Sequence, residues 1–80
     1  MSNLDERLAR CLALVLPAVQ KGELEQASSI TVRGWDSLAT VTLVSMVEEE
    51  FGIEVPFEEL ENFLSFQGMR AFLMKTTGAR

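Results

Sequence analysis

The residue best placed to do chemistry is Ser37, which follows Asp36 at the start of a long apolar stretch. A serine hydroxyl becomes a strong nucleophile when a nearby base takes its proton, and histidine is the usual base. The chain has no histidine, which excludes a Ser-His-Asp triad, a Cys-His pair and a histidine-ligated metal site. Lys21 or Lys75 stays formally open as a base, although nothing in the sequence brings either lysine near the serine. We therefore expect a protein that is not an enzyme and that has no metal site.

Two interpretations of Ser37 follow from its position. A serine before an apolar helix is first of all an N-cap that accepts a hydrogen bond from a backbone N–H. Asp36 could fill that role equally well, which would leave the Ser37 hydroxyl exposed at the positive end of the helix, a favourable place for a phosphate. At this point Ser37 is either a helix cap or a site of modification.

The helix that begins at Ser37 is the strongest predicted element and extends to about Phe51, where Gly52 stops it. One arc of this helix is apolar and should face the core: Ala39, Leu43, Val44, Met46, Val47 and Phe51. The opposite arc carries Leu38, Val41, Thr42, Ser45, Glu48 and Glu49. Leu38 and Val41 are apolar residues among polar ones, and their place near Ser37 indicates a docking patch for a partner.

Three further helices are expected around this one. The first spans about Asn3 to Leu16 and carries Cys11 on its apolar stripe, where a free cysteine acts as a small buried hydrophobe. A short helix should follow Pro56, and Ser65 should cap the last one. The short helix has as its apolar positions Phe57, Leu60, Phe63 and Leu64, and the last helix has Phe66, Met69, Phe72 and Leu73.

Residues 20–36 lack periodicity and are expected to form a long loop, held by Leu24, Ile30 and Val32 packing inward. Trp35 should cover the core, and the five phenylalanines are interpreted as core residues. The sequence thus predicts an all-α fold, a small four-helix bundle of three long helices and one short helix, with a long loop between helices one and two.

Composition limits the function further. The chain has 80 residues, 48% of them hydrophobic, and one cysteine, so we expect one domain over residues 1–80 that is held by packing and not by an internal disulfide. The net charge of −5 makes nucleic-acid binding improbable. The N-terminal stretch has neither the pattern of a secretory signal nor the length of a membrane span. We expect a cytoplasmic monomer that does not insert into membranes.

Charge is segregated along the chain. Between Gly34 and Met69 there is no Lys or Arg, while the same span holds eight acidic residues. A solvated helical face would explain such a run, but the absence of compensating cations equally favours an acidic face that meets basic partner surfaces.

The stretch GWDSLATVTLVSMVEEEFGIEVP resembles the central helix of acyl carrier proteins and of the wider phosphopantetheine-binding carrier family. The Asp36-Ser37-Leu38 triplet alone is a weak motif. It is joined here to an apolar helix that ends in three glutamates and Phe51-Gly52, and to Pro56 beyond it, and the resemblance covers nearly the whole chain.

The resemblance implies a specific role for several residues. Ser37 would be the serine that receives a 4'-phosphopantetheine arm from coenzyme A, through a separate magnesium-dependent phosphopantetheinyl transferase. Acyl groups would be held on the thiol of that arm as thioesters and presented to acyl-loading and acyl-transferring enzymes with basic docking surfaces. Asp36 matches the acid beside the attachment serine. Four residues match positions that contact partner enzymes, namely Leu38, Val41, Glu48 and Glu49.

The chain also departs from the carriers of fatty-acid synthesis. Those carriers commonly have acids where this chain has Ala39 and Thr42, and a large apolar residue where it has Ser45. Gly34-Trp35 before the aspartate is similar to stand-alone carriers of dedicated pathways. We therefore expect a specialised member, serving an envelope lipid, lipopolysaccharide or secondary-metabolite pathway. An aminoacyl or peptidyl carrier, and an unmodified helical interaction module, are the alternatives.

Overall fold

The computed structural model describes residues 3–78, which form three α-helices and two 3-10 helices joined by turns and irregular segments. In chain order these are α1 (Asn3–Val15), η1 (Lys21–Gln26), α2 (Ser37–Phe51), η2 (Phe57–Leu64) and α3 (Phe66–Thr77). No β-strand occurs within residues 3–78, where a single bridge joins Ser28 to Ser65. The all-α prediction is confirmed, with three long helices and a short one after Pro56.

The ends of α2 and α3 follow from local chemistry. The Asp36 carboxylate accepts a 2.9 Å hydrogen bond from the Ala39 amide, and the Ser65 hydroxyl accepts one of the same length from the Gly68 amide. Each side chain thereby satisfies a donor that has no partner within its helix. Gly52 ends α2 in the left-handed conformation, with φ 65°, which a residue without a Cβ adopts at little cost.

The core is built from the predicted stripes. The largest side chains that are fully buried are Leu8, Leu12, Leu43, Val47, Phe63, Met69 and Leu73. All four predicted inward positions of α3 are buried, and the Phe63 and Phe72 rings meet edge to face with centroids 5.7 Å apart. Cys11 is buried on the α1 stripe, as expected. The sequence pattern therefore identified the faces of the three α-helices correctly.

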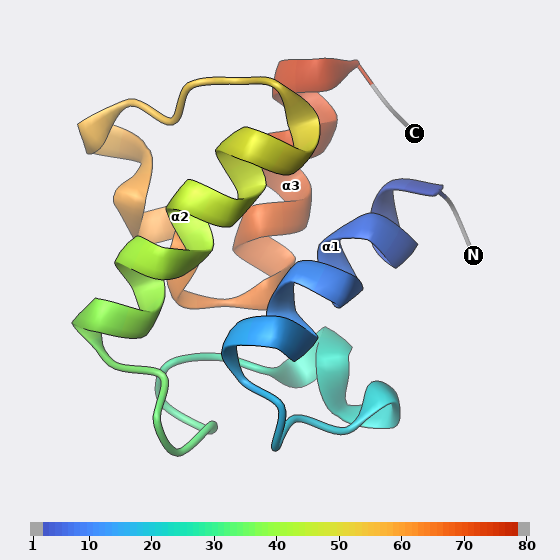
Figure 1. Ribbon diagram of the computed structural model, residues 1–80, viewed down its shortest axis with the longest axis vertical. Helices are drawn as coiled ribbons and strands as arrows, with labels where there is room; N and C mark the ends of the chain where they lie inside the picture. The colour runs from blue at the N-terminus through green and yellow to red at the C-terminus, as the bar shows by residue number, and fades with distance from the viewer. Residues whose placement is uncertain (1–2, 79–80) are drawn as a thin grey trace.

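Figure 1 shows how the helices lie: α1 beside α2, with η2 and α3 completing the far side of the core. Two ion pairs connect elements that are distant in the sequence. Arg7 on α1 reaches Glu50 near the end of α2 at 2.7 Å, and Arg70 on α3 reaches Asp5 on α1 at 2.7 Å. No helix of residues 3–78 has both the length and the apolar character needed to cross a bilayer.

The predicted loop over residues 20–36 is only partly irregular, because Lys21–Gln26 forms the helix η1. Its N-terminus is stabilised by a reciprocal pair of hydrogen bonds between Gln20 and Glu23, which apolar periodicity does not reveal. Leu24 and Val32 pack against the core as predicted, but the prediction for Ile30 is wrong, since its side chain is 93% exposed.

Two apolar positions of η2 are exposed, and the prediction that Phe57 belongs to the core is wrong. Phe57 is 83% exposed and Leu64 is 42% exposed, while Phe63 is fully buried. Side chains three residues apart share one face of a 3-10 helix, so Leu64, directly after the buried Phe63, lies off the buried face. Phe57 is in register with Phe63 and is exposed all the same, at the first residue of η2. Phe57 is therefore the phenylalanine that does not belong to the core.

Backbone hydrogen bonds fix the second half of the connecting segment in place. The Ser29 amide donates to the Leu64 carbonyl at 2.7 Å, and the Phe66 amide donates to the Ala27 carbonyl at 3.0 Å. The Val32 amide donates back to the Ser28 carbonyl at 2.9 Å. The chain that leads into α2 is thus attached to the junction between η2 and α3, which positions the start of α2.

Candidate functional site

Ser37 is the first residue of α2, and its side chain is exposed. Asp36 occupies the N-cap, with its side chain bonded to the Ala39 amide and its carbonyl bonded to both the amide and the hydroxyl of Thr40. The capping role that Ser37 could have filled therefore belongs to Asp36. No hydrogen bond joins the Ser37 hydroxyl to any of residues 3–78.

The first turn of α2 also keeps two backbone donors. The amides of Ala39 and Thr40 are bonded to Asp36, whereas the amides of Ser37 and Leu38 come too early in the helix to find a carbonyl within it. Such donors, together with the helix dipole, attract a negatively charged group. The site therefore offers a free hydroxyl beside two unbonded amides.

The segment before Ser37 forms a shallow hollow lined by residues 29–36. Arg33 is exposed on its rim and makes no ion pair with a carboxylate of residues 3–78. Trp35 lines the same hollow and is 3% exposed, so the prediction that it covers the core is confirmed. Its indole nitrogen, Nε1, is buried without a hydrogen-bond partner in the described chain.

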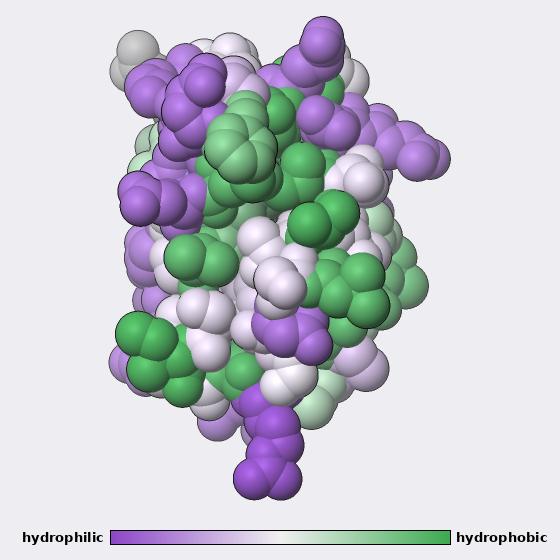
Figure 2. Space-filling view, turned by 90° about the vertical axis from the view of Figure 1, so that its left-hand side faces the viewer, coloured by the Kyte–Doolittle hydropathy of each residue, from purple (hydrophilic) through white to green (hydrophobic). Residues whose placement is uncertain are grey.

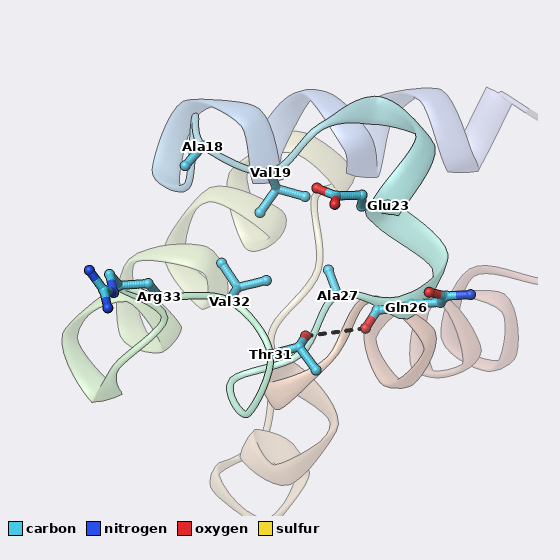
Figure 3. A pocket seen from close by; sticks show the side chains of 8 residues that line it. All are labelled: Ala18, Val19, Glu23, Gln26, Ala27, Thr31, Val32 and Arg33. Carbon is cyan, nitrogen blue, oxygen red and sulfur yellow. Dashed lines mark hydrogen bonds between the residues drawn. The ribbon is translucent and has the colours of Figure 1, made fainter.

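A second cavity, of about 280 Å³, shares Thr31, Val32 and Arg33 with this hollow (Figure 3). Val19, Ala27 and Val32 point toward its centre, while Arg33 extends away from it. The Thr31 hydroxyl donates a 3.3 Å hydrogen bond to the Gln26 carbonyl at its edge. This bond helps to fix the position of the segment that carries Arg33 and leads into α2.

The structure separates the predicted partner-contact residues of α2 into two kinds. Leu38 is 73% exposed and Val41 is 57% exposed, and Glu49 is also exposed. Glu48 is half-buried, and its carboxylate accepts a 2.8 Å hydrogen bond from the Val55 amide. Glu48 therefore holds the turn after α2, so Glu49 is the better candidate for an electrostatic contact with a partner.

Sequence reasoning missed four apolar residues that are exposed, namely Leu14, Ile30, Phe57 and Leu64. Figure 2 looks onto the side of the molecule that carries the start of α2 and η2, where hydrophobic side chains reach the surface at several places. The neighbours of Ile30, two serines and a threonine in the run Ser28-Ser29-Ile30-Thr31, were the available signal that this residue lies in a polar turn.

Ala39 is buried at 9% exposure within the core, as its place on the apolar arc predicted. An interpretation of Ala39 as a partner-contact position that has lost a charge is therefore wrong. An alanine here packs α2 against its neighbours and does not face a partner. Thr42 and Ser45 are exposed. At these two positions, therefore, the difference from the carriers of fatty-acid synthesis does alter the outer face of α2.

No other reactive group stands out in the described chain. Burial raises the pKa of the Cys11 thiol above its ordinary value of 9.0, and the Glu50 carboxylate adds to the effect. A thiol with a raised pKa is a poor nucleophile near neutral pH. Within residues 3–78 there is no group of three or more Cys, Asp or Glu residues that could hold a metal ion.

The fold and the exposed serine together define a class: small helical proteins that present a serine hydroxyl at the start of a helix. The family model described as the phosphopantetheine attachment site matches residues 6–73. The chain belongs to this family of carrier proteins, whose domain is the attachment site of a covalent 4'-phosphopantetheine group. No solved structure matches the chain.

The family adds general properties to this geometry. Its domains are carriers that are generally non-catalytic, are modified by a phosphopantetheinyl transferase and interact with partner enzymes. The residues present fit the prosthetic group, because an exposed hydroxyl without a partner is available for a phosphodiester bond. The two early amides of α2 would face the negative charge that such a bond brings.

Proposed function

We propose that Ser37 is the residue that receives the 4'-phosphopantetheine group, and that the domain over residues 1–80 functions as an acyl carrier. The observation that carries this proposal is the division of labour at the start of α2. Asp36 takes over the N-cap, so Ser37 is released from the structural role that most serines at this position have.

Loading transfers the phosphopantetheinyl group from coenzyme A to Ser37. The Ser37 oxygen bonds to the coenzyme A phosphorus that carries pantetheine, and the bond from that phosphorus to the neighbouring phosphate breaks. The adenosine bisphosphate leaves, and the proton of the hydroxyl passes to a base on the transferase. The chain contributes an exposed hydroxyl, which a transferase can reach without unfolding α2. When bound, the group supplies a terminal thiol that holds an acyl group as a thioester.

The outer face of α2 supports a role in docking. Leu38 and Val41 offer exposed apolar contacts close to Ser37, and Glu49 offers a negative charge further along the same helix. A partner with an apolar centre and a basic rim would match this arrangement. The same surface would serve the transferase and the enzymes that load or remove the acyl group.

We favour a specialised pathway over bulk fatty-acid synthesis. Thr42 and Ser45 lie exposed on the docking face, where the carriers of fatty-acid synthesis commonly have an acid and a large apolar residue. Fewer charges and less apolar area on this face would weaken contacts with the enzymes of that general pathway. An envelope-lipid, lipopolysaccharide or secondary-metabolite pathway fits better, and the glutamates at the end of α2 favour an acyl carrier over an aminoacyl or peptidyl carrier.

The experiment is an intact-mass measurement after incubation with coenzyme A, magnesium and a phosphopantetheinyl transferase of broad specificity. The parent and Ser45→Ala should each gain one phosphopantetheine unit, while Ser37→Ala should gain none. Ser45→Ala is a matched control, because Ser45 is also exposed on α2. A folded parent that gains no mass would favour an unmodified interaction module.

A further inference from the structure

The geometry points to a subsite for the phosphodiester end of the arm on residues 29–36, built from the Trp35 indole N–H and the Arg33 guanidinium. This inference rests on the proposed attachment at Ser37 and goes beyond it. The first part of the arm would lie against residues 29–36, whereas the alternative is an arm that moves freely in solvent.

The buried indole is the first observation. Trp35 is 3% exposed, and its Nε1 has no hydrogen-bond partner among the described residues. A buried donor without an acceptor is costly, and native proteins rarely leave one unsatisfied. Trp35 lines the hollow that leads up to Asp36, the residue next to Ser37. An acceptor delivered into this hollow would lie near Trp35, and pairing requires the buried Nε1 to turn toward the hollow.

The second observation is the exposed cation on the same segment. The Trp35 amide donates to the Val32 carbonyl at 3.2 Å and Gly34 has φ 93°, so residues 32–35 form a tight turn with Arg33 at its corner. Arg33 makes no ion pair within residues 3–78 and lines the hollow. It is also the last cation before a span without Lys or Arg that reaches to Met69.

The chemistry of the arm matches these two groups. Its phosphodiester carries one negative charge, which a guanidinium can bind through two parallel hydrogen bonds. The hydroxyl and the first amide carbonyl of pantetheine follow within a few bonds and are hydrogen-bond acceptors. Arg33 lies four positions before Ser37, so their Cα atoms are at most about 14 Å apart. The subsite requires the Arg33 side chain to turn toward Ser37 and bind the phosphodiester, while Trp35 meets an acceptor beyond it.

The test uses the fact that Trp35 is the single tryptophan of the chain. A nitrogen-labelled sample gives one indole signal in a proton–nitrogen correlation spectrum, recorded before and after loading from coenzyme A, with intact mass measured on the same sample. We expect the indole proton to move downfield on loading, because the N–H gains an acceptor. In Arg33→Gln most of this movement should be lost, while Arg10→Gln, which removes an exposed cation on α1, should keep it.

The outcomes separate the subsite from the proposed attachment. A gain in mass with an unmoved indole signal would overturn the subsite and leave the attachment intact. No gain in mass would overturn both. Movement of the indole signal in Ser37→Ala, which cannot be loaded at that position, would assign the effect to free coenzyme A and count against the subsite. An Arg33→Gln spectrum equal to that of the parent would contradict the role of Arg33.

Discussion

At the scale of single residues, Asp36 and Ser37 divide two tasks that one side chain could have performed. The Asp36 carboxylate bonds to the Ala39 amide and so stabilises the start of α2. The Ser37 hydroxyl has no bond within the described chain and stays available for chemistry. Helix capping explains Asp36, and the proposed attachment of the arm explains the exposed Ser37.

Asp36→Ala and Asp36→Asn should separate the capping role of this residue from its charge. Asp36→Ala removes the 2.9 Å hydrogen bond to Ala39, and we expect the free energy of unfolding to fall by about 1 kcal/mol. Asp36→Asn keeps a capping oxygen, so its stability should match that of the parent within a few tenths of a kcal/mol. Urea denaturation measures both.

The loading rates of the same two variants test the role of the carboxylate toward the transferase. If the charge of Asp36 helps to present Ser37, Asp36→Asn should be loaded more slowly although it remains as stable as the parent. Equal rates for Asp36→Asn and the parent would show that only the cap matters.

Cys11 should make stability depend on alkaline pH. Burial raises the pKa of its thiol above 9.0 in the folded protein, so the folded state keeps a proton that the unfolded state releases. The contribution of this thiol to stability is full below about pH 9.0 and is lost as pH rises through the folded value. Unfolding free energies of the parent should therefore fall from pH 8 to pH 10 more steeply than those of Cys11→Ala. Parallel curves would contradict the assigned burial effect.

At the scale of elements, the junction between η2 and α3 depends on the absence of a side chain at Gly68. A Cβ at this position would lie 2.5 Å from the Asn62 carbonyl oxygen and 3.0 Å from the Ser65 hydroxyl that caps α3. The backbone of η2 cannot move away without disturbing Phe63, which is fully buried. A glycine inside a helix usually costs stability, but here it permits the close approach of two elements.

Gly68→Ala should therefore destabilise the protein although alanine favours helices. We expect the free energy of unfolding to fall by about 1–3 kcal/mol, because the overpacking outweighs the gain in helix propensity. Gly22→Ala is the matched control, since a Cβ there has no neighbour within 4 Å. That variant should be neutral or slightly stabilised. If Gly68→Ala were as stable as the parent in thermal denaturation, the backbone of η2 would be able to move away from the added Cβ, which would contradict this prediction.

The elements also show what the sequence could and could not predict. The three α-helices, the Ser65 cap and the inward residues of α3 were predictable, because period and capping chemistry act locally. The choice between Asp36 and Ser37 as the cap of α2 stayed open, because both side chains can accept from the first-turn amides. Ile30 and Phe57 were predicted inward from hydrophobicity alone, and both are exposed. Ile30 lies in a polar turn and Phe57 at the first residue of η2, and a hydrophobic side chain alone does not show that either position faces solvent.

At the scale of the whole molecule, the charges are arranged to act on association more than on chemistry. Ser37 and Glu49 are separated by about 18 Å along α2, given a rise of about 1.5 Å per residue. This distance exceeds the Debye length of about 8 Å at physiological ionic strength. Glu49 therefore cannot influence the Ser37 hydroxyl directly, and any effect must come from a partner that spans the helix.

Glu49→Lys should raise the KM of the transferase several-fold at low salt and leave kcat nearly unchanged. The difference from the parent should shrink as salt is added, because the contact is exposed and screened. Glu25→Lys, an equal charge change on η1, should have little effect if position matters and not net charge alone. Equal effects of both variants would contradict an oriented docking face on α2. Glu48 is left unchanged, since its bond to Val55 would be lost with the charge.

The measurement that tests the central claim most directly is fragmentation of the loaded parent protein in a mass spectrometer. The account predicts that all the added mass lies on fragments that contain Ser37, and none on fragments that contain only Ser28, Ser29, Ser45 or Ser65. Added mass on any other residue, or none on a folded chain, would contradict the assignment of Ser37 as the attachment site.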